Sequence, residues 1–453
     1  MPKIEVFSPF DGDYVGSFKD LSEKDVLIRV DKLSTYNKDL TEHEIHQCLK
    51  NLETLVKLNK KKFSRLITKE IGICIQDSEH EVDRSIEVIK LSSEECIRIN
   101  GYSSPSKIGS FNDFQLIHSF REPLGIIGCI TPFNHPLNQV VHKVCPALAA
   151  NNAVLLKPSA KSSITANFFA DLVYEAGFPE NMFQIVTGSS EMIGEIISKS
   201  SLIDMISFTG SHETSLKITR SAGVKKLFLE LGGSSVMLVC NDADIDLAVK
   251  VAINGCFKNS GQRCTAIRRI ITLPDIHVAF MEKFTSAARK IKCGNPFNEQ
   301  TDMGTVISSE YSKEIEKRVS LAIEDGAFLK LGGVSKGAFF PPTVLENVNP
   351  LSILTSVETF GPVAPVICAK NFDDAIYITN ETSYGLSSSI ITNSLNNIFE
   401  FSSRVKVGGV RVNMPPGMRN EYLPFGGVKD SGYGRSGVRH SIEEMTYLKT
   451  LII

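Results

Sequence analysis

The sequence has almost no excess of charge of either sign. Its 453 residues include 49 lysines and arginines against 51 aspartates and glutamates, a formal net charge of −2 at pH 7. A chain without a basic surface is not expected to bind nucleic acid. Nucleic acid is therefore not an expected partner.

Long apolar runs are missing as well. No stretch reaches the length that a bilayer-spanning helix needs. The first residues, from Met1 to Glu5, lack the basic flank and apolar stretch of a secretory signal. We therefore expect no membrane as a partner.

The ten cysteines lack the close spacing of zinc and redox sites, because no two of them form a CxxC pair. We therefore predict no metal ion. Cys129, Cys145, Cys240 and Cys368 lie in apolar runs and are expected to be small buried residues. Such cysteine usage suits a reducing compartment, so we predict a cytoplasmic protein.

The chain is too long for a single hydrophobic core, and two or three domains are expected. In the first half, short apolar runs end in turns rich in Gly, Ser, Thr or Lys. These runs are residues 124–130, 153–156, 183–186 and 205–208. Helical segments separate them, and this alternation predicts a doubly wound parallel sheet. Ligands of such sheets bind at the carboxyl ends of the strands, where these turns fall.

A second alternating α/β region is expected from about residue 236 to residue 410. Its strand-like runs are residues 236–239, 269–272, 365–368 and 389–391. The last nine residues, 445–453, have the pattern of an exposed terminal strand. An apolar strand at a sheet edge is a liability unless another chain covers it, which predicts a homo-oligomer.

Cys264 and the earlier Glu230 together suggest a covalent reaction cycle. A thiolate attacks a carbonyl carbon, and a carboxylate base later activates water to cleave the thioester. Arg263, directly before the cysteine, adds a positive charge that would favour a thiolate and an anionic substrate. A cysteine protease is an alternative, but Cys264 lacks protease-type surroundings.

Seven motifs follow one another in a fixed order. They are PFNHP at 132–136, KPS at 157–159, FTGS at 208–211, ELGG at 230–233, GQRC at 261–264, ETFGPV at 358–363 and PFGGVKDSG at 424–432. With these motifs the chain resembles the NAD(P)-dependent aldehyde dehydrogenase superfamily over nearly its whole length. A non-catalytic relative is the alternative, but the joint presence of Cys264, Glu230 and Asn134 argues against it.

The resemblance implies a fold of three parts. A Rossmann-like doubly wound cofactor domain would comprise residues 1–103 and 124–231, and a second α/β catalytic domain residues 232–423. A small β oligomerisation arm would comprise residues 104–123 and 439–453. A homodimer or homotetramer would follow.

The resemblance also implies roles for individual residues. Cys264 would be the nucleophile, Glu230 the base for deacylation, and Asn134 an oxyanion donor together with the backbone N–H of Cys264. Lys143 would lie near the cofactor. The cofactor-binding residues would be Thr131, Pro132, Lys157, Ser159, Ala160, Gly210, Ser211, Leu231, Gly232, Glu358 and Phe360.

Three positions depart from the usual pattern of the superfamily, one of them Ser215 in place of a common Gly. Ala160 replaces a Glu that often binds the adenosine ribose hydroxyls. A carboxylate there would repel a 2′-phosphate, so its loss permits NADP, and we expect NAD or NADP as the cofactor. Ser436 stands where many members have a second acidic residue, so Glu230 must serve alone as the base.

The choice of aldehyde depends on a further resemblance, to the phosphonoacetaldehyde dehydrogenase subfamily. Four residues match its anion-binding positions, namely Arg84, His135, Arg263 and Arg419. Arginine forks suit a dianion, so the expected reaction is oxidation of phosphonoacetaldehyde to phosphonoacetate. The alternative is another anionic aldehyde, such as glyceraldehyde 3-phosphate (non-phosphorylating) or an aldehyde bearing a carboxylate or sulfonate.

Overall fold

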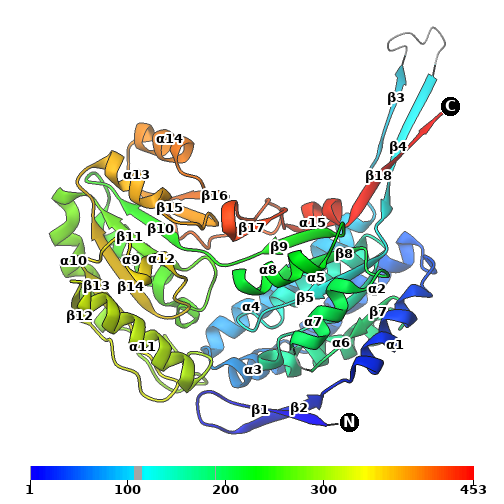
Figure 1. Cartoon of the computed structure of the whole chain (residues 1–453), viewed down its shortest axis with the longest axis horizontal. Helices are drawn as coiled ribbons and strands as arrows, with labels where there is room; N and C mark the ends of the chain where they lie inside the picture. Colours follow the sequence, from blue (N-terminus) through cyan, green and yellow to red (C-terminus); the bar gives the residue numbers. More distant parts are fainter. Residues whose placement is uncertain (1, 107–114, 189) are drawn as a thin grey trace.

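Two large sheets, a projecting three-stranded arm and an N-terminal hairpin organise the chain in this computed structural model (Figure 1). The structure describes residues 2–106, 115–188 and 190–453. The hairpin pairs β1 (Lys3–Phe7) with β2 (Tyr14–Lys19) in antiparallel fashion. Four helices follow it: α1 (Glu23–Ser34), α2 (Glu42–Leu58), α3 (Lys60–Ile71) and α4 (Ile75–Cys96).

The first large sheet has six strands in the order β17-β9-β8-β5-β6-β7. They are β5 (Ile126–Ile130), β6 (Ala153–Lys157), β7 (Phe183–Ile185), β8 (Met205–Thr209), β9 (Lys226–Glu230) and the antiparallel β17 (Gly432–Tyr433). The crossovers use α5 (Asn138–Ala149), η1 (Ala160–Ser162), α6 (Ser163–Glu175), α7 (Ser190–Lys199) and α8 (His212–Ser221). This is the doubly wound parallel sheet that the sequence predicts.

Helices cover both faces of this sheet, so its central strands β5, β6 and β8 are buried at every position and are mostly apolar. On β5, Ile127 and Cys129 belong to the core shared with α2 to α6. Ile126 and Ile130 belong to the core shared with α1, α7 and α8. Successive side chains of a strand point to opposite faces, which is why a continuous apolar run marks a strand buried on both sides.

The second large sheet has seven strands in the order β12-β13-β14-β11-β10-β15-β16. They are β10 (Ser235–Val239), β11 (Ile267–Thr272), β12 (Phe328–Leu331), β13 (Thr343–Glu346), β14 (Val363–Cys368), β15 (Ser387–Ile391) and β16 (Gly409–Val412), of which β12 is antiparallel to β13. Its surrounding helices are α9 (Ile245–Phe257), η2 (Lys258–Gly261), α10 (Pro274–Arg289), α11 (Ser309–Glu324), α12 (Ile353–Ser356), α13 (Phe372–Asn380) and α14 (Leu395–Arg404). Cys368, expected to be buried, is exposed because it is the last residue of β14.

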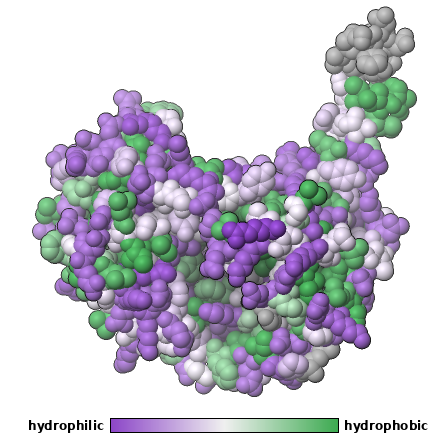
Figure 2. All heavy atoms as spheres, viewed as in Figure 1, coloured by the Kyte–Doolittle hydropathy of each residue, from purple (hydrophilic) through white to green (hydrophobic). Residues whose placement is uncertain are grey.

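The arm projects away from the body of the molecule (Figure 1). It pairs β18 (Thr446–Ile452) with β4 (Gln115–Pro123) and β4 with β3 (Tyr102–Ser106), after the short helix α15 (Val438–Glu444). Residues 107–114 of the predicted arm lie outside the described residues. Figure 2 shows hydrophobic residues on the arm, where Leu448, Leu451 and Ile452 are exposed. The predicted domain limits and the assembly through this arm stay predictions.

The chain passes from one large sheet to the other through residues 231–234, between β9 and β10. Here the two sheets meet, and β17 returns from far along the chain with Gly432 opposite Glu230. Within the described residues no helix is long and apolar enough to span a membrane.

Candidate active site

Cys264 follows a strained turn at the end of α9. Asn259 and Ser260 have φ angles of 59° and 52°, which residues other than glycine rarely adopt. Gly261 has a φ of 69°. Arg268 on β11 holds this turn, because its guanidinium donates hydrogen bonds to the carbonyls of Gly261 and Arg263. Strain kept in place by surrounding contacts is characteristic of functional sites.

Cys264 is partly exposed, and its surroundings favour the protonated thiol. Burial raises its pKa to about 12, and the carboxylates of Glu358 and Glu230 act in the same direction. Arg419 and Arg263 act in the opposite direction. The thiol must lose its proton before it can attack a carbonyl group.

Asn134 lies beside the same turn, although it comes from the loop after β5. Its side-chain amide donates a hydrogen bond to the carbonyl of Gln262 at 2.9 Å. In return, the amide of Asn259 donates to the Asn134 carbonyl at 3.2 Å. The predicted oxyanion donor is therefore held against the turn that carries the predicted nucleophile.

Glu230, the last residue of β9, is buried and charged. Burial favours its neutral form, but Lys143 and Arg419 outweigh this effect and lower the pKa of the carboxyl group. Lys143 Nζ lies 3.9 Å from Glu230 Oε2, which also accepts a hydrogen bond from Thr209 at 3.0 Å. The other oxygen, Oε1, has no hydrogen-bond partner among the described residues and can accept a proton.

Lys143 was expected near the cofactor, and the structure places it between Glu230 and Ser207. Its ammonium group donates to the Ser207 hydroxyl at 3.1 Å, and burial lowers its pKa. Ser436 accepts a hydrogen bond from Arg419 at 3.1 Å.

Glu358 lies beside the Gly232-Gly233 turn. Gly233 N–H donates to Glu358 Oε1 at 3.2 Å, and a Cβ on Gly232 would come within 2.5 Å of Oε2. Burial raises the pKa of Glu358 to about 6, and Arg268 opposes this shift. The ring of Phe360 meets that of Phe133 edge to face at 6.0 Å.

The remaining predicted cofactor residues gather at the carboxyl ends of β5, β6, β8 and β9. These are Thr131, Pro132, Lys157, Ser159, Ala160, Gly210, Ser211 and Leu231.

The Thr131 hydroxyl is buried without a hydrogen-bond partner among the described residues. Lys157 donates to the adjacent Pro158 carbonyl at 3.3 Å, and burial lowers its pKa to about 8. Ser211 caps the first turn of α8. An unpaired hydroxyl, a buried ammonium and a helix N-terminus suit a ligand with phosphates and sugar hydroxyls.

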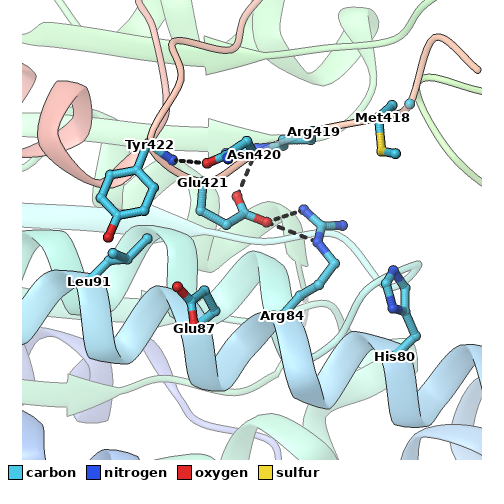
Figure 3. Close-up of a pocket in the computed structure, with 10 residues that line it drawn as sticks. His80, Arg84, Glu87, Leu91, Met418, Arg419, Asn420, Glu421 and Tyr422 are labelled. Atoms are coloured by element: carbon cyan, nitrogen blue, oxygen red, sulfur yellow. Dashed lines mark hydrogen bonds and ion pairs between the residues drawn. The ribbon is translucent and has the colours of Figure 1, made fainter. Parts of the chain in front are cut away.

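Two of the four predicted anion-binding residues meet, but around a carboxylate. Arg84 on α4 donates to Glu421 Oε1 through Nε at 2.9 Å and Nη2 at 2.6 Å. Arg419 Nε lies 3.0 Å from Glu421 Oε2. Figure 3 shows Glu421 between the loop that carries Arg419 and the helix that carries Arg84. The sequence analysis did not identify Glu421. The signal was available, because this carboxylate stands only two positions after the predicted anion-binding residue Arg419.

The other two anion-binding candidates have different partners. His135 Nδ1 lies 3.1 Å from Glu81 Oε2 on α4. Arg263 donates to the carbonyls of Asn254 at 2.6 Å and Gly255 at 3.2 Å, at the end of α9. The structure therefore does not gather the four residues into one free cationic cradle.

Among residues 2–106, 115–188 and 190–453, no group of three or more His, Cys, Asp or Glu side chains could hold a metal ion. The site depends on a thiol, carboxylates, amides and buried cations. This set of groups suits acyl transfer through cysteine.

Comparisons with known proteins agree with this chemistry. A lactaldehyde dehydrogenase of Methanococcus maripaludis is 34% identical over 457 residues, covering 99% of this chain and 97% of the relative. A 3-sulfolactaldehyde dehydrogenase of Priestia aryabhattai is 35% identical, over 91% of this chain and 86% of the relative. A glyceraldehyde-3-phosphate dehydrogenase of Methanocaldococcus jannaschii, solved with NADP, is 36% identical with a TM-score of 0.96, covering 99% of this chain and 98% of that one.

These relatives are named for lactaldehyde, sulfolactaldehyde and glyceraldehyde 3-phosphate. They do not support the subfamily resemblance to phosphonoacetaldehyde dehydrogenase. The sequence profile of the aldehyde dehydrogenase family matches residues 2–451. The chain therefore belongs to the aldehyde dehydrogenase family of enzymes and has its α/β fold.

Proposed function

We propose that this enzyme oxidises a small three-carbon 2-hydroxyaldehyde to the corresponding acid, with NADP or NAD as the hydride acceptor and a thioester on Cys264. The observation that carries the proposal is the convergence of Cys264, Asn134, Glu230 and Glu358 where the two large sheets meet. A nucleophile, an oxyanion donor and a base are thereby available to one carbonyl group.

The first half of the reaction forms the thioester. The Cys264 proton leaves to a nearby acceptor, and Glu230 Oε1 is the charged oxygen that the site offers. Cys264 Sγ then bonds to the aldehyde carbon, while Asn134 Nδ2 and the Cys264 N–H donate to the developing oxyanion. This carbon must then lose a hydride, and a bound nicotinamide cofactor would supply the acceptor.

The second half restores the thiol. Glu230 first releases to solvent the proton it took from the thiol. It then takes a proton from water, the hydroxide oxygen bonds to the thioester carbon, and the carbon–sulfur bond breaks with its electron pair on Cys264 Sγ. The acid leaves, and Cys264 regains its proton. Ionised Glu230 suits this step, because its lowered pKa keeps it deprotonated at neutral pH.

The cofactor site accepts NADP in this proposal. Ala160, in η1, has no carboxylate to repel a 2′-phosphate, and the side chains of Lys157 and Lys161 are cations in the same turn region. The solved relative from Methanocaldococcus jannaschii is complexed with NADP.

The substrate class follows from the relatives. Lactaldehyde, sulfolactaldehyde and glyceraldehyde 3-phosphate are all three-carbon 2-hydroxyaldehydes that differ in the group on C3. The names of the relatives support the alternative substrates, glyceraldehyde 3-phosphate and a sulfonate aldehyde, better than the predicted phosphonoacetaldehyde.

The test is the rate of NADPH or NADH formation with these three aldehydes. We expect Cys264→Ser to lower kcat/KM by ~10³-fold or more, because a hydroxyl is a far weaker nucleophile. Cys293→Ser, which replaces an exposed cysteine, is the matched control and should keep the wild-type rate. A Cys264→Ser enzyme as active as this control would refute the thioester route.

A further inference from the structure

A cavity of about 310 Å³ lies between α4 and the loop of residues 417–422. From α4 it is lined by His80, Arg84, Glu87 and Leu91, and from the loop by Gly417, Met418, Arg419, Asn420, Glu421 and Tyr422. Figure 3 shows Glu421 pointing from the loop toward Arg84 on the helix. The charged lining therefore combines two guanidinium groups with two carboxylates.

Glu421 is the centre of this arrangement. It is buried, accepts two hydrogen bonds from Arg84 and lies 3.0 Å from Arg419 Nε and 3.1 Å from His142 Nε2. Burial favours the neutral acid, yet His142, Arg419 and Arg84 hold the pKa of Glu421 well below its ordinary value. Glu421 therefore contacts both arginines, Arg84 through Oε1 and Arg419 through Oε2.

The cavity also communicates with the reacting groups. Arg419 influences the pKa values of both Cys264 and Glu230, so its guanidinium lies within electrostatic range of both. Gly417, from the same loop, lies against Thr265, the residue that follows the thiol. A C3 substituent of an aldehyde held at Cys264 would therefore encounter the Glu421–Arg419 pair.

We propose that Glu421 is a specificity-determining residue, which binds Arg84 and Arg419 and so makes the cavity select three-carbon 2-hydroxyaldehydes without a dianionic group on C3. The inference rests on the proposed function and names its substrate class. A phosphate would have to compete with Glu421 for the two arginines, whereas a methyl or hydroxymethyl group needs no cationic partner.

The test compares kcat/KM for lactaldehyde, sulfolactaldehyde and glyceraldehyde 3-phosphate, whose C3 groups carry increasing negative charge. We expect wild-type enzyme to prefer lactaldehyde. In Glu421→Gln, which keeps the shape of the side chain, the ratio for glyceraldehyde 3-phosphate over lactaldehyde should rise by ~10-fold or more. Inhibition by inorganic phosphate should strengthen in the same variant. A ratio that stays constant or falls in folded Glu421→Gln would overturn the proposal.

Glu87→Gln is the matched control, since it removes the same charge from the same cavity but leaves the Arg84–Glu421–Arg419 contacts in place. In Glu87→Gln, kcat/KM for glyceraldehyde 3-phosphate relative to lactaldehyde should change by no more than ~2-fold. A change as large as that in Glu421→Gln would mean that the net charge of the cavity sets the ratio, and it would refute the proposal. If Glu421→Gln does not fold, Arg84→Gln serves instead. Arg84→Gln partly frees the Glu421 carboxylate, so kcat/KM for glyceraldehyde 3-phosphate relative to lactaldehyde should fall. An unchanged ratio in Arg84→Gln would overturn the proposal.

The two levels of inference fail in different ways. If wild-type enzyme forms no NADPH or NADH with any of the three aldehydes, the proposed function fails. If wild-type enzyme oxidises them and Glu421→Gln leaves the ratio and the phosphate inhibition unchanged, only the role of Glu421 fails.

Discussion

Glu230 shows how one carboxyl group can stay charged inside the protein. Burial favours its protonated form, but the ammonium of Lys143 at 3.9 Å and the guanidinium of Arg419 reverse the balance. Glu230→Gln should therefore form the thioester and then hydrolyse it slowly, with a steady-state rate ~10²-fold lower or more. Rapid mixing should show a burst of NADPH, and mass spectrometry an acyl group on Cys264. A steady-state rate equal to wild type would remove Glu230 from this role.

Ala160 gives a second prediction at the scale of a single residue. Ala160→Glu would place a carboxylate in η1, where it would repel the 2′-phosphate of NADP. We expect kcat/KM for NADP to fall by ~10-fold or more while that for NAD changes little. Ala160→Gln has a similar shape without the charge and is the control. Equal effects of the two substitutions would contradict an electrostatic cause.

At the scale of elements, the start of α6 depends on a neighbouring helix. Ser162, its N-cap residue, makes no capping hydrogen bond, and Glu70 on α3 instead accepts from Ile164 N–H at 2.7 Å and Thr165 N–H at 3.0 Å. The carboxyl thus replaces a local cap and joins α3 to α6. Glu70→Ala should lower the apparent Tm, with a loss of ~1–3 kcal/mol for the unmade hydrogen bonds.

Glu70 also gives a pH dependence with a definite sign. Burial raises its pKa in the folded protein from 4.5 to about 7. The folded state then holds the proton more tightly, so this group's contribution to stability is complete below the unfolded pKa and declines as pH rises toward 7. In Glu70→Gln this decline should disappear. The measurement is the difference in apparent Tm between wild type and variant at pH 5 and pH 8, and a difference that does not change with pH would contradict it.

At the scale of the whole molecule, the arm presents apolar side chains to solvent. Leu448 and Ile452 are exposed and lie on one face of β18, which pairs along its length with β4. Leu448→Lys combined with Ile452→Lys should reduce the mass measured by sedimentation, because a charged strand edge resists pairing with another chain. Lys449→Ala on the opposite face is the control. An unchanged mass for the double variant would place the assembly elsewhere.

Sequence patterns predicted the parts of this molecule that depend on local order. Mostly apolar runs located β5, β6, β8 and β10, because strands buried on both faces carry few polar side chains. The short strands β12 and β17 were not predicted. The four residues of β12 are largely exposed and β17 has only two residues, so neither shows a hydrophobic period. The Arg84–Glu421 pair joins a helix to a loop distant in sequence, and such a partnership is created by tertiary packing alone.

The pairing of β17 with β9 has a consequence for how the protein is made. Gly432 on β17 lies opposite Glu230, so the edge of β9 has no neighbour until the ribosome has added some two hundred further residues. A nascent chain that already contains Cys264 and Glu230 therefore exposes the unpaired edge of β9 beside the proposed catalytic base Glu230. A chain cut short between β16 and β17 would contain all seven strands of the second sheet and the five parallel strands of the first. Its outer edge at β9 would stay unpaired, and the product would be prone to aggregate through that edge.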